Sequence, residues 1–276
     1  MTLLPGKVEE KLKRKDKLMN PQMPPETQRE QKSNALKAFA ARSPFFFALV
    51  FFVVSFCLSL VGPPASLWGV VQSLFAIGVL AWLGWLRLAG FNGPSQWRSL
   101  HLLWLPGLWA LFYLFPFLLT MQVSGAMVVV LIAPFALLNG LREEALFRGV
   151  ILQALLPYGW RRAAALSALF FGLFHLQNLL YYPPLIVLAQ IIGTFLFGFG
   201  FAACRLRTNT IWPLIIFHAC NDLIAFSASN GGIVPPIYDS LWFVCGGIVF
   251  NLVLAGYGLF LLRPRRQQQL ETLAEQ

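Results

Sequence analysis

The sequence is poor in charge: only 12% of its 276 residues are Asp, Glu, Lys or Arg, whereas 58% are hydrophobic. A soluble globular domain carries about 25% charged residues. The long apolar runs also show no polar face that could meet water. These two shortages exclude a soluble fold and predict an integral membrane protein, with the lipid bilayer and no nucleic acid among its partners.

Cysteine is also scarce. The chain has four cysteines, no two of which form a C-x-x-C pair. This number and spacing indicate neither a disulfide framework nor a cysteine metal site. Because Cys57, Cys204, Cys220 and Cys245 lie within or at the ends of apolar segments, we expect buried structural thiols.

Long apolar segments dominate what is present. Ser43 to Gly62 alone has about the length that a helix needs to cross the ~30 Å hydrocarbon layer. Helices are expected because their backbone hydrogen bonds close internally. We predict an all-α fold, a polytopic bundle of about eight transmembrane helices. The expected spans are residues 44–62, 67–86, 100–119, 124–141, 163–180, 185–204, 210–227 and 238–262.

The stretch that follows the fourth span leaves two alternatives. Residues 143–157 either extend that helix after a break near Gly140 or form a separate dipping or interfacial helix. The chemistry of the chain depends on this stretch, because it begins with two adjacent acids, Glu143 and Glu144.

Basic residues alternate between the connections of the spans. No Lys or Arg occurs near 63–66, 120–123, 181–184 or 228–237, whereas the N-terminal tail and the other connections are basic. By the positive-inside rule, both termini are cytoplasmic in a multi-pass protein of the plasma membrane. The predicted regions are a basic cytoplasmic tail (1–43), an eight-helix membrane domain (44–262) and a short polar C-terminal tail (263–276).

Few ionisable groups lie between residues 43 and 262, apart from the basic residues. They are the acids Glu143, Glu144, Asp222 and Asp239 and the histidines His101, His175 and His218. An ionisable group at membrane depth is costly unless it is paired or hydrated, so each is a functional candidate. We expect His101 to be interfacial and Asp239 to be solvated beside an outer loop.

The spacing of these groups suggests partners. Glu144 and Arg148 are four residues apart and can pair on one helix face, whereas Glu143 has no basic partner at that spacing. His218 and Asp222 also share a face, from which Asn221 points away. Helix capping by the acids and helix packing by the histidines are the structural alternatives. Together, Glu143, His175 and the His218–Asp222 pair could polarise water, take its proton and stabilise an oxyanion, as an amide hydrolase requires.

Three short motifs carry a family resemblance. "EEALFR" (Glu143 to Arg148), "FGLFH" (Phe171 to His175) and "HACND" (His218 to Asp222) are similar to E-E-x3-R, F-x3-H and H-x3-N/D. The chain thereby resembles the intramembrane proteases related to the eukaryotic CAAX prenyl protease, including the bacterial CPBP, or Abi, branch. By motif, the resemblance covers about residues 124–227.

The resemblance implies a role for each motif residue. Glu143 would be the general base that activates water, with His175 assisting it or binding a metal. His218 and Asp222 would form an oxyanion site or complete a metal set. Supporting roles fall to Glu144, Arg148 and Asn221. Zinc held by His175 and His218 and a metal-free, glutamate-type mechanism are both compatible with these residues.

The position of Asp222 departs from the family pattern, which often has Asn there. An Asn side chain can donate a hydrogen bond to an oxyanion, but an ionised Asp cannot. We therefore expect Asp222 to orient His218 or to act as a ligand, with a protonated Asp222 or a donating Asn221 as alternatives.

The predicted activity is that of an endopeptidase that cuts a peptide bond of a peptide or membrane-protein substrate in or near the bilayer. Two other classes stay open from the sequence: a non-catalytic scaffold, immunity or regulatory protein, and a proton-coupled transporter, since intramembrane Glu and His also form proton relays. Whether the substrate is prenylated is not encoded in the sequence.

Overall fold

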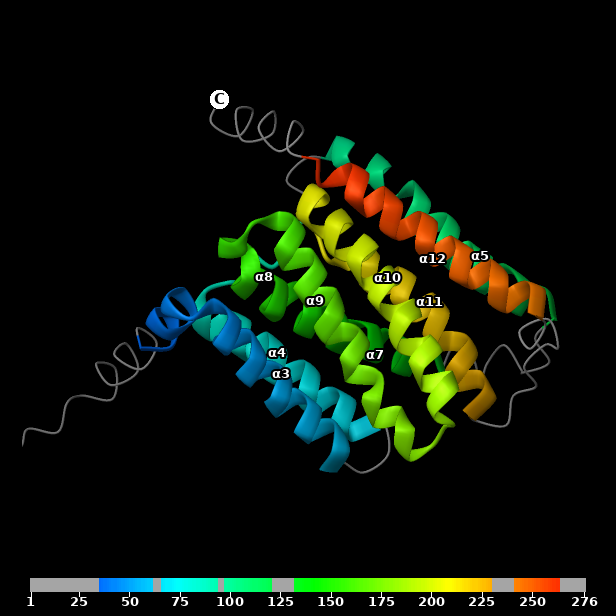
Figure 1. Ribbon diagram of the computed structural model, residues 1–276, viewed down its shortest axis with the longest axis horizontal. Coiled ribbons are helices and arrows are strands. Elements are labelled where there is room, and N and C mark those ends of the chain that lie inside the picture. Colours follow the sequence, from blue (N-terminus) through cyan, green and yellow to red (C-terminus); the bar gives the residue numbers. More distant parts are fainter. Residues whose placement is uncertain (1–34, 62–65, 94–96, 121–131, 230–240, 264–276) are drawn as a thin grey trace, which may run out of the picture. The chain divides into compact units, whose positions relative to one another are not determined.

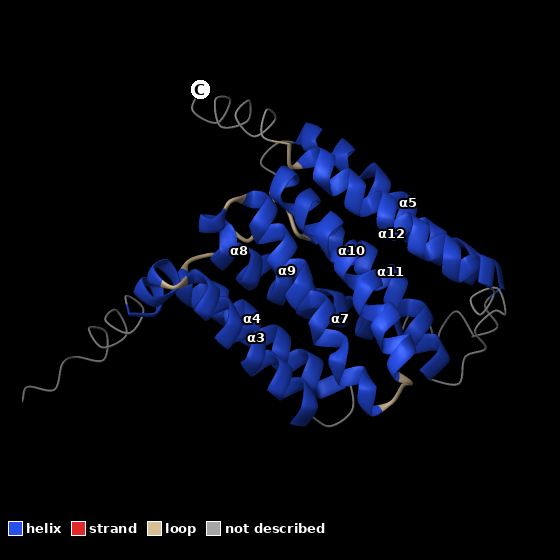
Figure 2. Cartoon of the chain, viewed as in Figure 1, coloured by secondary structure: helices blue, strands red, loops and turns tan. Residues whose placement is uncertain are grey.

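The computed structural model describes residues 35–61, 66–93, 97–120, 132–229 and 241–263. The chain divides into two compact units, residues 1–39 and 40–276. Of the predicted tails, 1–43 and 263–276, the structure describes only residues 35–43 and 263. Within those residues every regular element is a helix, as Figure 2 shows, so the predicted all-α fold is confirmed.

The helices follow the expected spans closely. In chain order they are α3 (Pro44–Val61), α4 (Ser66–Leu83), η1 (Trp97–Leu103), α5 (Trp104–Thr120), α7 (Ala133–Glu144), η3 (Ala145–Ile151), α8 (Leu152–Leu155), η4 (Leu156–Tyr158), α9 (Trp160–Phe174), η5 (His175–Leu180), α10 (Pro184–Thr208), α11 (Trp212–Ser229) and α12 (Leu241–Leu261). Two candidate spans, Trp160–Leu180 and Pro184–Thr208, are long and apolar enough by themselves to cross a membrane. The described residues contain up to three such spans if the helix pair Ala35–Arg42 and Pro44–Leu60 counts as one. The described residues therefore support a membrane helix bundle without fixing the number at eight.

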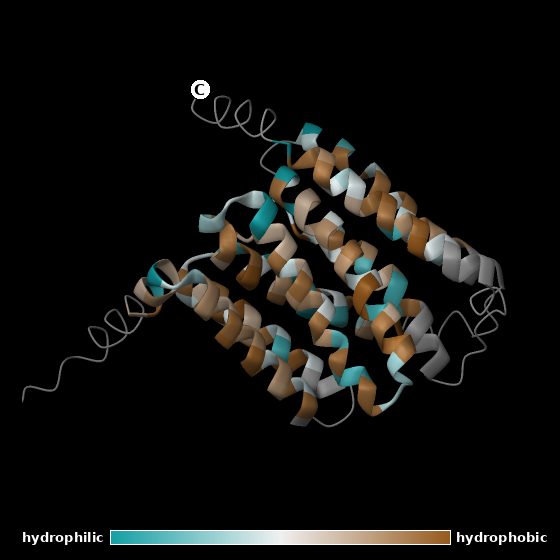
Figure 3. Cartoon of the chain, viewed as in Figure 1, coloured by the Kyte–Doolittle hydropathy of each residue, from teal (hydrophilic) through white to brown (hydrophobic). Residues whose placement is uncertain are grey.

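The outer surface of the helices is apolar. Large hydrophobic side chains such as Phe46, Leu74, Leu185 and Val249 are more than half exposed, and Figure 3 shows hydrophobic residues along most helices. Such a surface is compatible with lipid and not with water. Cys57 is also exposed, so the prediction that all four cysteines are buried is wrong for this residue. Cys57 lies on the apolar outer surface of the helices, among other exposed apolar side chains.

The central helices pack tightly around α7. Figure 1 shows α9 and α10 side by side, and α7 contacts both α4 and α11. The α7–α11 contact depends on Gly140, because a Cβ atom there would lie 2.8 Å from the backbone oxygen of Ile215. This close approach brings the two acids of α7 to the polar face of α11.

The helix does not break at Gly140. It continues as an α-helix to Glu144 and then changes to a π-helix over Ala145–Ile151 before α8 resumes the α form. Of the two alternatives, the stretch extends the fourth helix, and the irregularity lies directly after the two acids. Single π turns inside α-helices occur frequently at functional sites.

Replacing Gly140 by Ala is expected to destabilise the protein. The added methyl group would force α7 away from the backbone of Ile215, and overpacking of this kind costs about 1–3 kcal/mol. The unfolding midpoint in detergent measures the effect. Gly78→Ala is the matched control, because a Cβ atom at Gly78 has no neighbour within 4 Å. Equal midpoints for the two variants would contradict the packing argument.

Candidate active site

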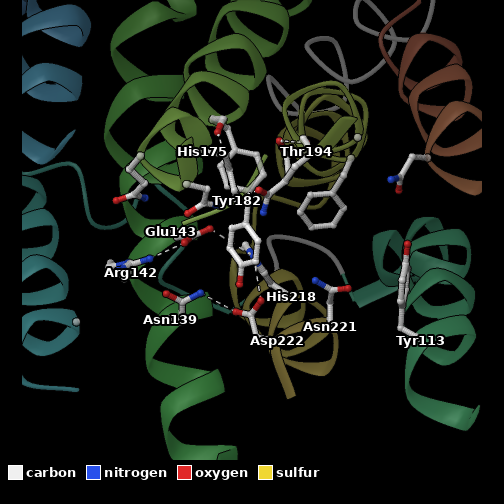
Figure 4. A pocket seen from close by; sticks show the side chains of 18 of the residues that line it. Tyr113, Asn139, Arg142, Glu143, His175, Tyr182, Thr194, His218, Asn221 and Asp222 are labelled. Carbon is white, nitrogen blue, oxygen red and sulfur yellow. Dashed lines mark hydrogen bonds and ion pairs between the residues drawn. The ribbon is translucent and has the colours of Figure 1, made fainter. Parts of the chain in front are cut away.

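The candidate site is a pocket of about 740 Å³ between the central helices (Figure 4). The four residues predicted to be catalytic all line this pocket: Glu143 from α7, His175 from the junction of α9 and η5, and His218 and Asp222 from α11. Side chains from three parts of the sequence are thus brought together in one place. Convergence of scarce ionisable groups on one pocket is the arrangement expected of a functional site.

Glu143 contacts two cationic or polar partners. Nη2 of Arg142 donates a hydrogen bond to Oε1 of Glu143 at 2.6 Å, and Nε2 of His218 lies 3.5 Å from Oε2. The sequence offers Glu143 no basic partner at the i, i+4 spacing, and the structure pairs it with the adjacent Arg142 instead. The carboxylate of Glu143 is buried, and its Oε2 faces His218 on α11.

Glu144 pairs with Arg148, as the i, i+4 spacing predicted. The Nη1 atom of Arg148 lies 3.1 Å from Oε1 of Glu144, and both side chains are almost completely buried. The same oxygen is 2.8 Å from Nδ1 of His218. Glu144 therefore lies behind His218 and fixes the orientation of its ring.

Asp222 is held mainly from α7. Its Oδ2 accepts a hydrogen bond from Nδ2 of Asn139 at 2.8 Å, whereas its Oδ1 lies 3.9 Å from Nε2 of His218, too far for a hydrogen bond. Asp222 can thus influence His218 through its charge. Asn221, which follows on another face of α11, lines the same pocket (Figure 4).

His175 lies where α9 changes to the 3₁₀-helix η5, and not in the middle of a regular span. Its Nδ1 is 3.0 Å from the backbone oxygen of Phe171. Since a carbonyl oxygen only accepts, the proton of the neutral ring is on Nδ1, and Nε2 keeps its lone pair. His175 can therefore accept a hydrogen bond from a molecule in the pocket.

The placement of these side chains does not fit a zinc site. Zinc in a catalytic site takes three protein ligands. In the part of the chain that the structure describes, no three His, Cys, Asp or Glu side chains are placed to hold one metal ion. We therefore derive no catalytic step through a metal.

Two further ionisable groups were candidates from the sequence, His101 and Asp239. His101 is exposed, and its Nδ1 contacts the backbone oxygen of Arg98. Its interfacial position stays a prediction. Asp239 lies outside the described residues.

Several polar residues of the pocket escaped the sequence analysis. Asn139 lies one helical turn before Glu143, and a search of the apolar spans for amide side chains would have found it. The same search finds Asn178 and Gln190, which hydrogen-bond to each other at 2.7 Å, and Asn251, which accepts from Trp109 at 2.8 Å. These residues line the pocket with neutral donors and acceptors.

Residues 123–224 match the family model of the type II CAAX prenyl endopeptidases, described as Rce1-like. The chain carries an Rce1-like domain. The match covers somewhat more than a third of the chain and contains all three motifs, so the resemblance inferred from them is confirmed. No curated protein and no solved structure matches the chain.

The Rce1-like domain supports, in general, a CAAX-type intramembrane protease that acts on a peptide or protein in the membrane. Every residue of the pocket that α7, α9 and α11 contribute lies within the matched region. The family match and the pocket therefore concern the same part of the chain.

Proposed function

We propose that the protein is a glutamate-type intramembrane endopeptidase of the cell membrane. The observation that carries the proposal is the convergence of Glu143, His175, His218 and Asp222, from three helices, on one pocket. The pocket lies in a chain whose helices expose apolar side chains to their surroundings. Hydrolysis of a peptide bond there requires groups that bring water into an apolar environment and activate it.

Glu143 and His175 are the groups that would activate water. A water molecule between them donates one hydrogen bond to Oε2 of Glu143 and one to Nε2 of His175. As its oxygen attacks the carbonyl carbon, its proton passes to the Glu143 carboxylate. When the tetrahedral intermediate collapses, the C–N bond breaks and the same proton passes to the leaving amine. Glu143 is thereby restored as a carboxylate.

His218 would stabilise the oxyanion of the intermediate. Its Nδ1–H donates to Glu144, so an imidazolium ring would present Nε2–H toward the pocket. The carboxylates of Glu143, Glu144 and Asp222 lie 3.5, 2.8 and 3.9 Å from the nitrogens of the ring and would balance the charge of an imidazolium.

Comparison of new peptide termini tests the proposal and does not require an identified substrate. Membranes of cells that express the wild-type protein or the double variant Glu143→Gln/His175→Ala are compared by mass spectrometry of protein termini. We expect termini within or beside apolar segments that arise only with the wild-type protein. Identical sets of termini would contradict an endopeptidase and favour the scaffold or transporter alternatives.

Chelators are expected to leave cleavage unchanged. Because the described residues offer no set of three ligands, removal of zinc should not affect Glu143 or His175. Cleavage of a substrate found by terminus profiling is measured with and without 1,10-phenanthroline, and the zinc content of the purified protein is measured beside it. Loss of cleavage with phenanthroline and its recovery with added zinc would show that the zinc alternative is correct.

A further inference from the structure

The pocket extends toward one end of the helices. On α10 its lining residues are Ile186, Gln190, Gly193, Thr194 and Phe197, which extend from the N-terminal end to just past the middle, whereas Arg205 and Arg207 lie near the C-terminal end. Gln190 precedes Arg205 by 15 residues, which corresponds to about 22 Å along an α-helix. On this helix, then, the pocket and the arginines lie at different depths.

The helix that packs against α10 shows the same separation. α9 begins at Trp160 and is followed by η5, and Arg161 and Arg162 lie in its first turn. The lining residues His175, Gln177 and Asn178 lie at the opposite end, where the hydrogen bond from Asn178 to Gln190 connects η5 to α10. Since the two helices run antiparallel, their arginines share one end and their pocket residues share the other.

The lining residues become exposed at the end without arginines. Tyr182 and Ile186 are 55% and 56% exposed, whereas Glu143 and His218 are only 5% and 4% exposed. The described residues thus place the acids and histidines at the bottom of the pocket and Tyr182 and Ile186 at its rim. Arg142 also lines the pocket, but it is ion-paired with Glu143.

The distribution of basic residues assigns sides to these two ends. Arg161, Arg162, Arg205, Arg207 and Arg263 lie at the helix ends away from the rim, and the connection at residues 181–184 has no Lys or Arg. Arg142 and Arg148 lie inside the continuous helical stretch from Ala133 to Tyr158, whereas the other arginines lie in the first or last turn of a helix or directly after one, where the positive-inside rule applies. The rule places the arginine end in the cytoplasm and the rim of the pocket on the other side.

We infer that the pocket opens toward the extracytoplasmic side and takes a polypeptide whose scissile bond lies in the extracytoplasmic half of the membrane. The inference rests on the proposed function. The rim agrees with such a substrate, because Ile186 and Phe135 are exposed apolar residues, while Asn178, Gln190 and Thr194 are uncharged hydrogen-bonding groups. Apolar side chains and a peptide backbone fit this lining, and an acidic or basic segment does not.

Cysteine labelling tests the side on which the pocket opens. In a cysteine-free background, Gln177→Cys reports on the pocket and Tyr181→Cys on the exposed connection next to its rim, whereas Arg162→Cys is the matched control at the arginine end. A membrane-impermeant maleimide is added to intact cells and then to permeabilised cells. We expect Gln177→Cys and Tyr181→Cys to be labelled in intact cells, and Arg162→Cys to be labelled only after permeabilisation. The reverse pattern, or labelling of Gln177→Cys only after permeabilisation, would overturn the inference.

The position of the cut separates this inference from the proposed function. Termini that depend on the wild-type protein are expected in the extracytoplasmic half of the substrate's apolar segment. Cuts in the cytoplasmic half or in cytoplasmic tails would overturn the inference and leave the peptidase assignment standing. Absence of any cut, together with the expected labelling, would overturn the peptidase assignment and leave the orientation of the pocket standing.

Discussion

Replacing Glu143 by Gln is expected to reduce cleavage by about 10²–10⁴-fold, the range that positioned general acid–base groups contribute. The carboxamide has nearly the same shape as the carboxylate. It can still accept the hydrogen bond from Arg142 through its oxygen, but it cannot take a proton from water. The initial rate on a substrate found by terminus profiling measures the effect.

Stability provides the control for this variant. Glu143 lies next to Arg142 and 3.5 Å from His218, so a loss of activity could also come from a disturbed pocket. The unfolding midpoint and the yield from membranes should therefore be measured beside the rate. A well-folded Glu143→Gln protein with wild-type rates would contradict the assignment of Glu143 as the base.

The positions of the helices could be predicted because hydropathy acts over many residues at once. Pro44–Val61 differs from the predicted span 44–62 by one residue, and Pro184–Thr208 extends the span 185–204 by only a few. The π-helix at Ala145–Ile151 could not be predicted in this way. Its residues include good helix formers beside Gly149, and none of them marks a π turn, so we attribute the extra residue in the turn to packing against neighbouring helices.

Residue types were easier to predict than contacts. Glu144 and Arg148 pair as expected, because side chains four residues apart on one helix are neighbours. The partner of His218 was expected to be Asp222 by the same rule, yet its hydrogen bond goes to Glu144, 74 positions earlier in the chain. That contact depends on how closely α7 approaches α11, which local spacing cannot show.

Asn139 illustrates the same limit. It occupies the turn before Glu143, but only the packing of α7 on α11 brings it to Asp222. The hydrogen bond satisfies one oxygen of that acid and so supports the charge-based role of Asp222 beside His218. The departure from the family's frequent Asn at this position is thus accompanied by an amide side chain from another helix.

Replacing Arg148 by Met is expected to destabilise the protein by about 3–5 kcal/mol, because it leaves the Glu144 carboxylate buried without its guanidinium partner. Arg148 is 1% exposed, and its guanidinium carbon lies 4.4 Å from the centre of the Phe171 ring. Met retains apolar contact with this ring but removes the charge. Unfolding in detergent with increasing denaturant measures the loss, and the exposed Arg162→Met is the matched control, expected to change little.

The double variant Arg148→Met/Glu144→Gln distinguishes two roles of the pair. If Glu144 only balances Arg148, removing both charges should restore stability and activity together. Because Glu144 also accepts the hydrogen bond from Nδ1 of His218, we expect stability to recover in part while the rate stays low. A carboxamide at this position no longer offers the charge that favours an imidazolium ring, so the oxyanion would lose its donor. Full recovery of the rate would show that His218 is oriented without the Glu144 carboxylate.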